Sequence, residues 1–344
     1  MQYSLPAEWY PQSAVQLTWP HKKSDWQPWL KSIQAVYVQL AKAITRYQRL
    51  VIACHDQKLK STVSQLLENE GIDMAQVRVF VAPCNDTWAR DHGPITLVDA
   101  EGQTKILDFT FNAWGDKYAA MLDDKITQTL IQQPFCQLEN YQSLTLVLEG
   151  GSIESDGRGT LLTTETCLLN PNRNADLSKD ELEASLKAHL GMKQIIWLKH
   201  GALAGDDTDA HIDTLARFAP KGIVYVQCQD ETDPHFTELN KMAAELKAAR
   251  DIEGKAYNLF PLPWPSPIFN DEGEQLPATY ANYLVINGAV LVPVYNDDKD
   301  ALALAQIGEA HPGLDIIGID CRTVIQQFGS LHCLTMQIPK PLIQ

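Results

Sequence analysis

The sequence has 344 residues, of which 45% are hydrophobic and 21% are charged, and its formal net charge is −15. This length and composition indicate a globular protein with one large domain or two smaller ones. The acidity and the lack of any Lys/Arg-rich run argue against a nucleic-acid partner, and no apolar run reaches the roughly 20 residues of a membrane span.

The seven cysteines are widely spaced, odd in number and never arranged as Cys-x-x-Cys. This spacing argues against a disulfide framework and against a structural zinc site. Residues 1–6 lack the basic region and the apolar core of a signal peptide. We therefore expect a cytoplasmic protein with reduced thiols, most of them buried as apolar filler.

Along the chain, the first 25 residues are rich in Trp, Pro and Tyr and predict an irregular lead-in. Ser24 is a candidate N-cap for the first helix, and Ser178 with Glu181 forms a capping box that begins another. Helical spacing of apolar residues predicts that first helix over residues 24–47 and further helices over residues 57–69, 119–132, 234–249 and 299–309.

Short apolar runs predict strands between these helices, with turns at Asp156-Gly157 and Asn287-Gly288. The elements group into five strand–loop–strand units, and no linker divides them, so we expect one α/β domain of residues 1–344. Chemically reactive residues recur at unit ends about sixty positions apart, which suggests an internal repeat around an axis. The predicted strands are residues 50–54, 77–81, 95–98, 144–148, 160–163, 194–198, 215–218, 223–226, 257–260, 283–292, 316–319 and 331–336.

Residues 206–213 hold four carboxylates and one histidine. Taken alone, the stretch is a solvated acidic loop. If residues 211–213 open the strand 215–218, alternation places His211 and Asp213 on one face. An imidazole beside a fixed carboxylate is suited to proton transfer, so the pair is a candidate catalytic element.

Cys333 follows a glycine-containing loop near the C-terminus. A cysteine and a distant histidine such as His211 can form a nucleophile and its base, whereas a buried core cysteine is the simpler alternative. In a strand over 331–336, the side chain of His332 would point to the face opposite Cys333.

A metal site is the competing interpretation of the acidic residues. Asp207, Asp209, Asp213 and Glu149 would suit a hard cation that prefers oxygen ligands. The loop lacks the EF-hand pattern, however, and a metal leaves Cys333 without a role. These observations weigh against a metal, and the family resemblance given below implies that no metal and no organic cofactor is needed.

Several motifs resemble agmatine deiminases and the related bacterial peptidyl-arginine deiminases, in the family's order and over nearly the whole chain. They are Pro6-Ala7-Glu8-Trp9, Trp19-Pro20-His21, Trp88-Ala89-Arg90-Asp91-x-Gly93-Pro94, Glu149-Gly150-Gly151-Ser152, residues 160–174, Asp207-Thr208-Asp209-x-His211-x-Asp213 and Leu331-His332-Cys333-Leu334-Thr335. The resemblance implies the pentein fold, a five-bladed α/β propeller of ββαβ modules around a pseudo-fivefold axis.

The resemblance also implies hydrolysis of a guanidinium to a ureido group, with release of ammonia. By this reading Cys333 is the nucleophile, His211 moves the protons, Asp91 and Asp213 hold the guanidinium, and Glu149 assists or holds His211. Trp88, Trp114 and Gly329 would complete the substrate pocket.

Agmatine, a small cationic guanidine, is the expected substrate because no basic residue is placed to bind an α-carboxylate. Arginine and peptidyl-arginine remain alternatives within the family, and an amidinotransferase would share the covalent intermediate. From a different class, a non-catalytic metal- or polyamine-binding module with a buried Cys333 stays open, as does a homodimer.

Three positions depart from the family pattern. His92 stands where threonine is frequent, and Ala210 stands where glycine is usual before the histidine. Gln327-Phe328-Gly329-Ser330 stands where three glycines and an asparagine are usual. These departures bear on which guanidine the protein accepts.

Overall fold

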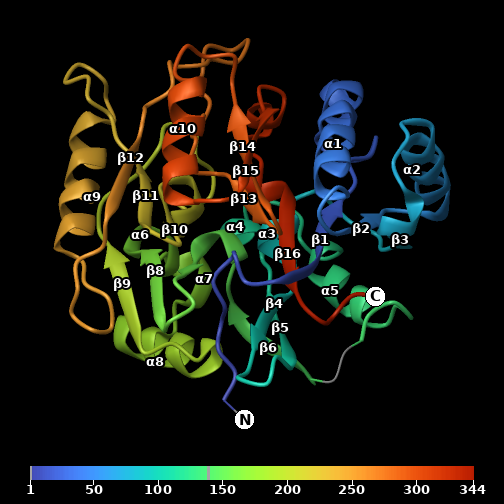
Figure 1. Ribbon diagram of the computed structural model, residues 1–344, viewed down its shortest axis with the longest axis horizontal. Helices are drawn as coiled ribbons and strands as arrows, with labels where there is room; N and C mark the ends of the chain where they lie inside the picture. The colour runs from blue at the N-terminus through green and yellow to red at the C-terminus, as the bar shows by residue number, and fades with distance from the viewer. Residues whose placement is uncertain (1, 138–139) are drawn as a thin grey trace.

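The computed structural model describes residues 2–137 and 140–344, and their strands form five small sheets (Figure 1). One sheet has the order β16-β1-β2-β3, and the others are β4-β5-β6, β7-β8-β9, β10-β11-β12 and β13-β14-β15. In every sheet one strand pairs antiparallel with its neighbour on one side and parallel with its neighbour on the other. The same pairing pattern therefore recurs five times, as the expected internal repeat requires.

The strands are short, as strands in such small sheets usually are. Their bounds are β1 Gln12–Thr18, β2 Arg49–Cys54, β3 Val77–Val81, β4 Ile95–Val98, β5 Thr104–Thr110, β6 Asn140–Val147, β7 Glu154–Ser155, β8 Thr160–Thr164, β9 Gln194–Leu198, β10 Ala216–Ala219, β11 Gly222–Val226, β12 Leu259–Leu262, β13 Leu284–Ile286, β14 Ala289–Val294, β15 Asp315–Asp320 and β16 Thr335–Pro339.

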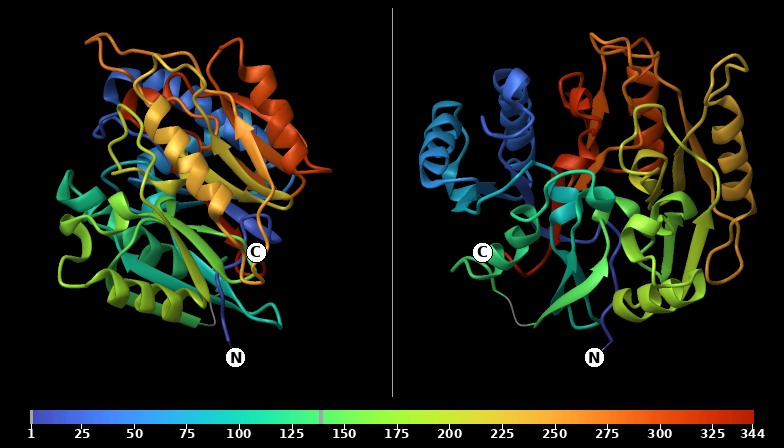
Figure 2. Two further views of the ribbon diagram at one scale, coloured as in Figure 1. Left: turned by 90° about the vertical axis from the view of Figure 1, so that its left-hand side faces the viewer. Right: turned by 180° about the vertical axis from the view of Figure 1, so that it is seen from behind.

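The longer helices lie on the outside of the molecule and the sheets lie inside (Figures 1 and 2). The α-helices are α1 Leu30–Ile44, α2 Gln57–Asn69, α3 Ala89–His92, α4 Ala113–Asp116, α5 Ile126–Ile131, α6 Glu165–Leu168, α7 Pro171–Asn174, α8 Lys179–Leu190, α9 Phe236–Ala248 and α10 Asp300–Ala310. Single 3₁₀ turns are η1 Gln27–Trp29, η2 Met74–Gln76, η3 Asp123–Lys125, η4 Gly150–Ser152, η5 Ile212–Thr214, η6 Val324–Gln327 and η7 His332–Leu334. No helix in the described part of the chain is both long and apolar enough to cross a membrane.

Several predictions from the sequence are confirmed. The helix α2, the strands β3, β4 and β9, and the Ser178–Glu181 capping box match the predicted positions. The helix expected from Ser24 begins only at Leu30, after a 3₁₀ turn, and Ser24 does not cap it. The helix expected over 119–132 is reduced to η3 and α5.

The strands predicted from the sequence leave out three that the structure contains. The first, β1, runs through the supposed irregular lead-in, and all seven of its residues are buried. It pairs with β16 from the other end of the chain, so the two termini share one sheet (Figure 1). The strand was not predicted because polar residues interrupt its apolar pattern. One of them, Gln12, is nevertheless buried, and its side chain donates to the backbone oxygens of Glu8 and Val285. The other two missed strands are β5 and the two-residue β7, which pairs with β8 across the predicted Asp156-Gly157 turn.

Candidate active site

One pocket brings together five of the residues expected from the sequence. Trp88, Asp91, Trp114, Gly329 and Cys333 all line it. The remaining lining residues are Asp25, Asp86, Tyr118, Asp207, Thr208, Gln327 and Phe328. The pocket thus combines a thiol, four carboxylates and an aromatic wall, and no Lys, Arg or His is among the described residues that line it.

Asp91 is held in a fixed orientation at the pocket wall. Its Oδ1 accepts the N–H of Gly151 at 3.0 Å, and its Oδ2 accepts the Trp114 indole N–H at 3.0 Å. Burial raises the pKa of Asp91 well above its usual range, and the nearby carboxylates Asp213 and Glu149 raise it further. A cation placed in the pocket would relieve this repulsion.

Gly151 is the point on which three candidate residues converge. A Cβ atom there would lie 2.6 Å from His211 Nδ1, 2.9 Å from Asp91 Oδ1 and 3.1 Å from Asp213 Oδ2. A side chain at this position would therefore force the three residues apart. Asp213, His211 and Glu149 are fully buried, and they lie behind the pocket wall that Asp91 and Cys333 form.

Cys333 lies in the 3₁₀ turn η7, with its Sγ 3.4 Å from Asn282 Oδ1 and 3.9 Å from Asp213 Oδ2. Burial raises the pKa of the Cys333 thiol well above its usual range, and Asp213 and Asp91 add to the effect. The same Asn282 oxygen accepts the backbone N–H groups of His332 and Cys333 at 2.9 and 3.3 Å. Asn282, which the sequence reading missed, therefore fixes the turn that presents the thiol.

His211 carries its two ring nitrogens in the interior without a hydrogen-bond partner among the described residues. Its nearest charged neighbour is Asp91, with 3.6 Å between His211 Nδ1 and Asp91 Oδ1. Burial lowers the pKa of His211 to about 3, so the ring is neutral at pH 7. A neutral imidazole with both nitrogens unbonded can accept a proton at one nitrogen and hold one at the other.

Glu149 has a different principal contact from the one expected. Arg173 Nε lies 2.9 and 3.1 Å from its two carboxylate oxygens, and the pair is fully buried. A carboxylate oxygen of Glu149 and a ring nitrogen of His211 lie within 4.8 Å of each other, but no hydrogen bond joins these two described residues. Burial raises the pKa of Glu149, although Arg173 opposes this. Arg173 also donates to Asp209 at 2.8 Å, so it ties the acidic loop to Glu149.

The prediction that His211 and Cys333 lie on strands is wrong, because both lie at 3₁₀ turns, η5 and η7, just before a strand. In each turn a hydroxyl three residues later bonds back to the carbonyl of the first residue, which bends the chain where a strand would stay extended. Glu149 begins a third turn of this kind. The three bonds are Ser152 Oγ to Glu149 O at 2.6 Å, Thr214 Oγ1 to His211 O at 2.8 Å and Thr335 Oγ1 to His332 O at 2.9 Å.

His332 does not point away from the site, as the strand prediction required. Its Nδ1 lies 2.8 Å from Asp213 Oδ2 and its Nε2 lies 2.7 Å from Glu8 Oε2. A carboxylate only accepts, so the ring donates to Asp213 through Nδ1, whereas Nε2 lies between the Glu8 carboxylate and the Arg217 guanidinium, whose Nη2 is 3.0 Å away. Burial and the charges of Arg217 and Arg90 lower the pKa of His332. Burial raises the pKa of Asp213, but the hydrogen bond from His332 and the nearby His332, His211 and Arg217 together outweigh burial and bring the pKa below its usual range. Arg217 donates to Glu8 at 2.7 Å and completes this buried network.

The carboxylates proposed for a hard cation are each engaged by a protein group. Asp207 accepts the Tyr118 hydroxyl at 2.5 Å, Asp209 pairs with Lys117 at 3.0 Å, and Asp213 and Glu149 have the partners described above. The carboxylate oxygens are therefore already bonded to protein groups and are not free to converge on one cation. This favours the guanidinium interpretation over the metal interpretation.

Trp88 forms the part of the wall expected to cover substrate methylenes. Its indole N–H donates to Asp86 Oδ2 at 3.1 Å, and its ring packs edge-on to Trp114 with centroids 6.4 Å apart. Gly329 lies directly against the Trp88 ring, where a Cβ atom would clash with the ring carbons. The glycine therefore lets the loop before Cys333 approach this tryptophan.

Comparison with known proteins also supports a site that binds a guanidinium. Residues 4–339 match the family model described as Porphyromonas-type peptidyl-arginine deiminase. An agmatine deiminase from Stutzerimonas stutzeri is 33% identical over an alignment of 365 positions that covers 99% of this chain and 97% of that protein. An agmatine deiminase of C. jejuni, solved as a cysteine-to-serine variant with substrate bound, is 40% identical with a TM-score of 0.90 and covers 99% of this chain and 97% of that one.

A more distant match concerns the fold alone. An amidinotransferase from Microseira wollei is 14% identical, with a TM-score of 0.52, over 100% of this chain and 99% of that one. The mixed α/β fold described above therefore matches structures of the pentein family.

Proposed function

The chain belongs to the Porphyromonas-type peptidyl-arginine deiminase family, together with the agmatine deiminases that it matches over nearly its full length, and on this premise we propose that it hydrolyses agmatine to N-carbamoylputrescine and ammonia. The protein is thus a hydrolase acting on a guanidino C–N bond. The lining of the pocket supports agmatine as the substrate, because it includes four aspartates and no basic residue among those described. Agmatine is a dication at neutral pH, and such a lining attracts it.

The same lining disfavours the alternative substrates. Free arginine would bring its α-carboxylate toward Asp25, Asp86 and Asp207, where no lining residue can pair with it. An unpaired charge in a partly buried site is costly, so arginine should react more slowly than agmatine. A peptidyl-arginine lacks that carboxylate and is the closer competitor.

In the proposed resting state, Cys333 is a thiol and His211 is a neutral base, as the effects of burial on their pKa values support. A guanidinium bound beside Asp91 and Asp213 adds a positive charge, which favours the thiolate. The thiol proton passes to His211 while the sulfur attacks the central guanidinium carbon. His211 then gives that proton to the departing nitrogen, ammonia leaves, and an amidino-thioether cation remains on Cys333.

The second half of the proposed reaction uses the same groups. His211 takes a proton from water, and the resulting hydroxide attacks the carbon of the intermediate. The C–S bond breaks, the proton on His211 passes to the Cys333 sulfur, and the ureido product forms as the hydroxyl proton of the intermediate is lost to solvent, where the released ammonia takes it up. Glu149 lies beside His211 and assists by holding the positive charge that His211 acquires in each half. Trp88 and Trp114 cover the methylenes of the substrate.

We further propose that residues 1–344 form a single domain, a five-bladed propeller of ββαβ modules around a pseudo-fivefold axis. Support comes from the pairing pattern shared by the five sheets. A cytoplasmic location agrees with the seven cysteines, which are all free. A homodimer completes the proposal, and light scattering over a range of concentrations tests it.

The experiment that tests this function is an ammonia-release screen over agmatine, arginine and arginine-containing peptides, with Cys333→Ser as the inactive control. We expect agmatine to give the highest kcat/KM. A higher value for a peptide would transfer the assignment to peptidyl-arginine. A folded protein that binds agmatine and releases no ammonia would support the non-catalytic binding module.

A further inference from the structure

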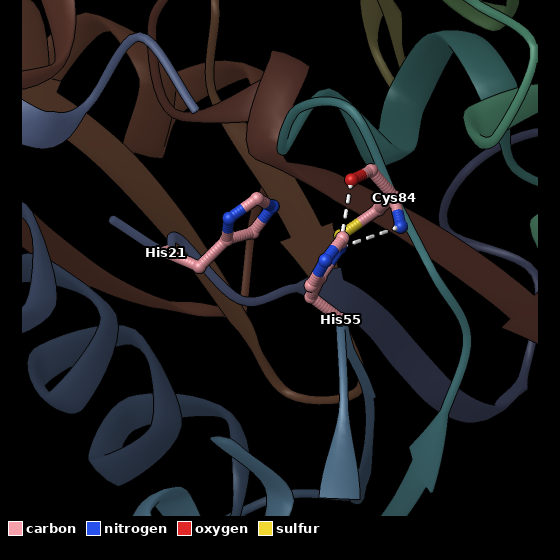
Figure 3. Close-up of side chains that lie close together, drawn as sticks. All are labelled: His21, His55 and Cys84. Atoms are coloured by element: carbon pink, nitrogen blue, oxygen red, sulfur yellow. Dashed lines mark hydrogen bonds between the residues drawn. The ribbon is translucent and has the colours of Figure 1, made fainter. Parts of the chain in front are cut away.

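A second cluster of chemically reactive side chains lies outside the pocket and consists of His21, His55 and Cys84 (Figure 3). One donor atom from each lies within 4.8 Å of the other two. The parallel strands β1, β2 and β3 each end a few residues before one of them, so the three side chains meet at one edge of a sheet. The carboxyl edge of parallel strands is a common place for ligand sites.

The hydrogen bonds of His55 leave one ring nitrogen available as a ligand. Lys23 Nζ lies 3.4 Å from His55 Nε2, and an ammonium can only donate, so Nε2 carries a lone pair. The ring proton is then on Nδ1, which lies 3.0 Å from the Cys84 carbonyl oxygen and donates to it. The Cys84 N–H lies 3.2 Å from the same nitrogen, but the Lys23 contact decides the tautomer. Metal-bound histidines characteristically donate their second ring proton to a carbonyl or carboxylate in this way.

His21 supplies the observation that points to a ligand. Its side chain is only 6% exposed, and its Nε2 has no hydrogen-bond partner among the described residues. The ring points toward His55 and Cys84, and it stacks on His55 with centroids 4.3 Å apart (Figure 3). His21 Nδ1 accepts the Lys23 N–H at 3.2 Å. Coordination through Nε2 would move the ring proton to Nδ1, and water would replace His21 as the partner of the exposed Lys23 amide.

We propose that His21, His55 and Cys84 form a binding site for a transition-metal cation of the zinc class. Two imidazole nitrogens and one sulfur suit Zn²⁺, with a fourth tetrahedral position open to water in the cavity that His21 and His55 line. Hard cations such as Mg²⁺ and Ca²⁺ would not bind, because the three residues offer no oxygen ligand. Binding releases the Cys84 thiol proton to solvent and displaces the Lys23 ammonium.

The site borders the substrate pocket without belonging to it. Cys84 precedes the pocket residue Asp86 by two positions, and His21 precedes the pocket residue Asp25 by four. A cation bound to both segments would join the two loops that form this wall. We therefore expect zinc to raise the melting temperature and to change the KM for agmatine more than kcat, and the binding itself does not depend on the proposed reaction.

The test is a Zn²⁺ titration by calorimetry on the metal-stripped full-length chain, in a Cys333→Ser background that removes the pocket thiol. We expect one ion per chain and a higher melting temperature. His55→Ala and Cys84→Ser should each weaken binding at least tenfold. The matched controls His200→Ala and Cys136→Ser replace one partly exposed histidine and one cysteine outside the cluster, and they should leave the titration unchanged.

Cobalt(II) gives a second readout that does not depend on affinity. Thiolate coordination should produce a sulfur-to-cobalt charge-transfer band, which Cys84→Ser should abolish and Cys136→Ser should retain. Circular dichroism confirms that each variant is folded, and if Cys84→Ser unfolds, Cys84→Ala with the same cobalt readout replaces it. Binding with other than one ion per chain, or binding that His55→Ala and Cys84→Ser leave unchanged, would overturn the proposal.

Discussion

His332 and Asp213 are 119 residues apart in the chain and are joined by a buried 2.8 Å contact between Nδ1 and Oδ2. The opposite ring nitrogen of His332 contacts Glu8, from the N-terminal segment, at 2.7 Å. His332 thus acts as a positioning residue, because it fixes and charges the carboxylate that we assign to the guanidinium.

The two nitrogens of His332 can be tested separately. The amide of asparagine replaces Nδ1 and keeps a donor for Asp213, whereas the amide of glutamine replaces Nε2 and keeps a donor for Glu8. We expect His332→Gln to lose about tenfold more kcat/KM than His332→Asn, because only His332→Asn preserves the Asp213 contact. Equal losses, measured on variants of equal melting temperature, would assign His332 a purely structural role.

The raised pKa of the Cys333 thiol predicts slow alkylation of the free enzyme at pH 7. Below that pKa the thiolate fraction grows about tenfold per pH unit, so the rate with iodoacetamide should rise with pH in the same proportion. Iodoacetate should react more slowly than iodoacetamide, because Asp91 and Asp213 repel it. Mass spectrometry follows the modification, with Cys333→Ser as the blank, and a fast, pH-independent rate at neutral pH would contradict the thiol resting state.

The variants His211→Ala and Asp213→Asn should be defective in different steps of the reaction. His211→Ala removes the proton carrier for both halves, and a covalent adduct on Cys333 should accumulate if hydrolysis is slowed more than attack. Asp213→Asn should lose about 3–5 kcal/mol of transition-state stabilisation and form little adduct, by analogy with breaking a buried charged pair. Intact-protein mass spectrometry after mixing with agmatine separates the two. Normal adduct formation by Asp213→Asn would move the guanidinium clamp to Asp91 and Glu149.

Asp86 predicts a pH dependence of substrate binding. Burial, together with Asp25, raises its pKa to about 7. As pH rises through that value the carboxyl loses its proton, the wall becomes more negative, and agmatine should bind more tightly between about pH 6 and 8. Calorimetry on Cys333→Ser measures this without turnover, and adding Asp86→Asn should flatten the dependence. The same shift makes folding less favourable as pH rises from about 4 to 7, because over this range the acid ionises in the unfolded chain while burial keeps it protonated in the folded protein.

The backbone conformation of Ala210 predicts a stabilising substitution next to His211, the candidate catalytic histidine. The φ of Ala210 is +64°, a left-handed conformation that side chains disfavour. Ala210→Gly should raise the free energy of unfolding by about 0.5–1 kcal/mol, whereas Ala216→Gly in the extended strand β10 should lower it by a similar amount. Denaturant melts measure both changes, and a loss of stability in Ala210→Gly would mean that the alanine methyl packs favourably.

Local periodicity predicted much of the fold because it depends on neighbouring residues. The helix α2 and the strands β3 and β9 follow from the spacing of apolar side chains alone. The strand β1 escaped notice because its buried polar residues are satisfied by segments far away in the sequence. The register of such contacts cannot be read from a short window.

The chemical identity of the candidate site was easier to predict than its shape. Cys333, Asp91 and the two tryptophans line one pocket, as expected. Arg173 and Asn282 were missed because each acts through contacts to residues far away in the sequence. A hydroxyl three residues after Glu149, His211 and His332 was the available signal for the 3₁₀ turns, and it recurs even though the preceding side chains differ.

That recurring hydroxyl has a thermodynamic consequence for the reaction. In each of the three turns, a serine or threonine closes a ring that holds the backbone of a candidate catalytic residue or of its immediate neighbour. The conformational entropy of these segments is lost when the chain folds, before any guanidine arrives. Little reorganisation then remains for the chemical step, and weakening a ring should cost rate even where the reacting side chains are unchanged.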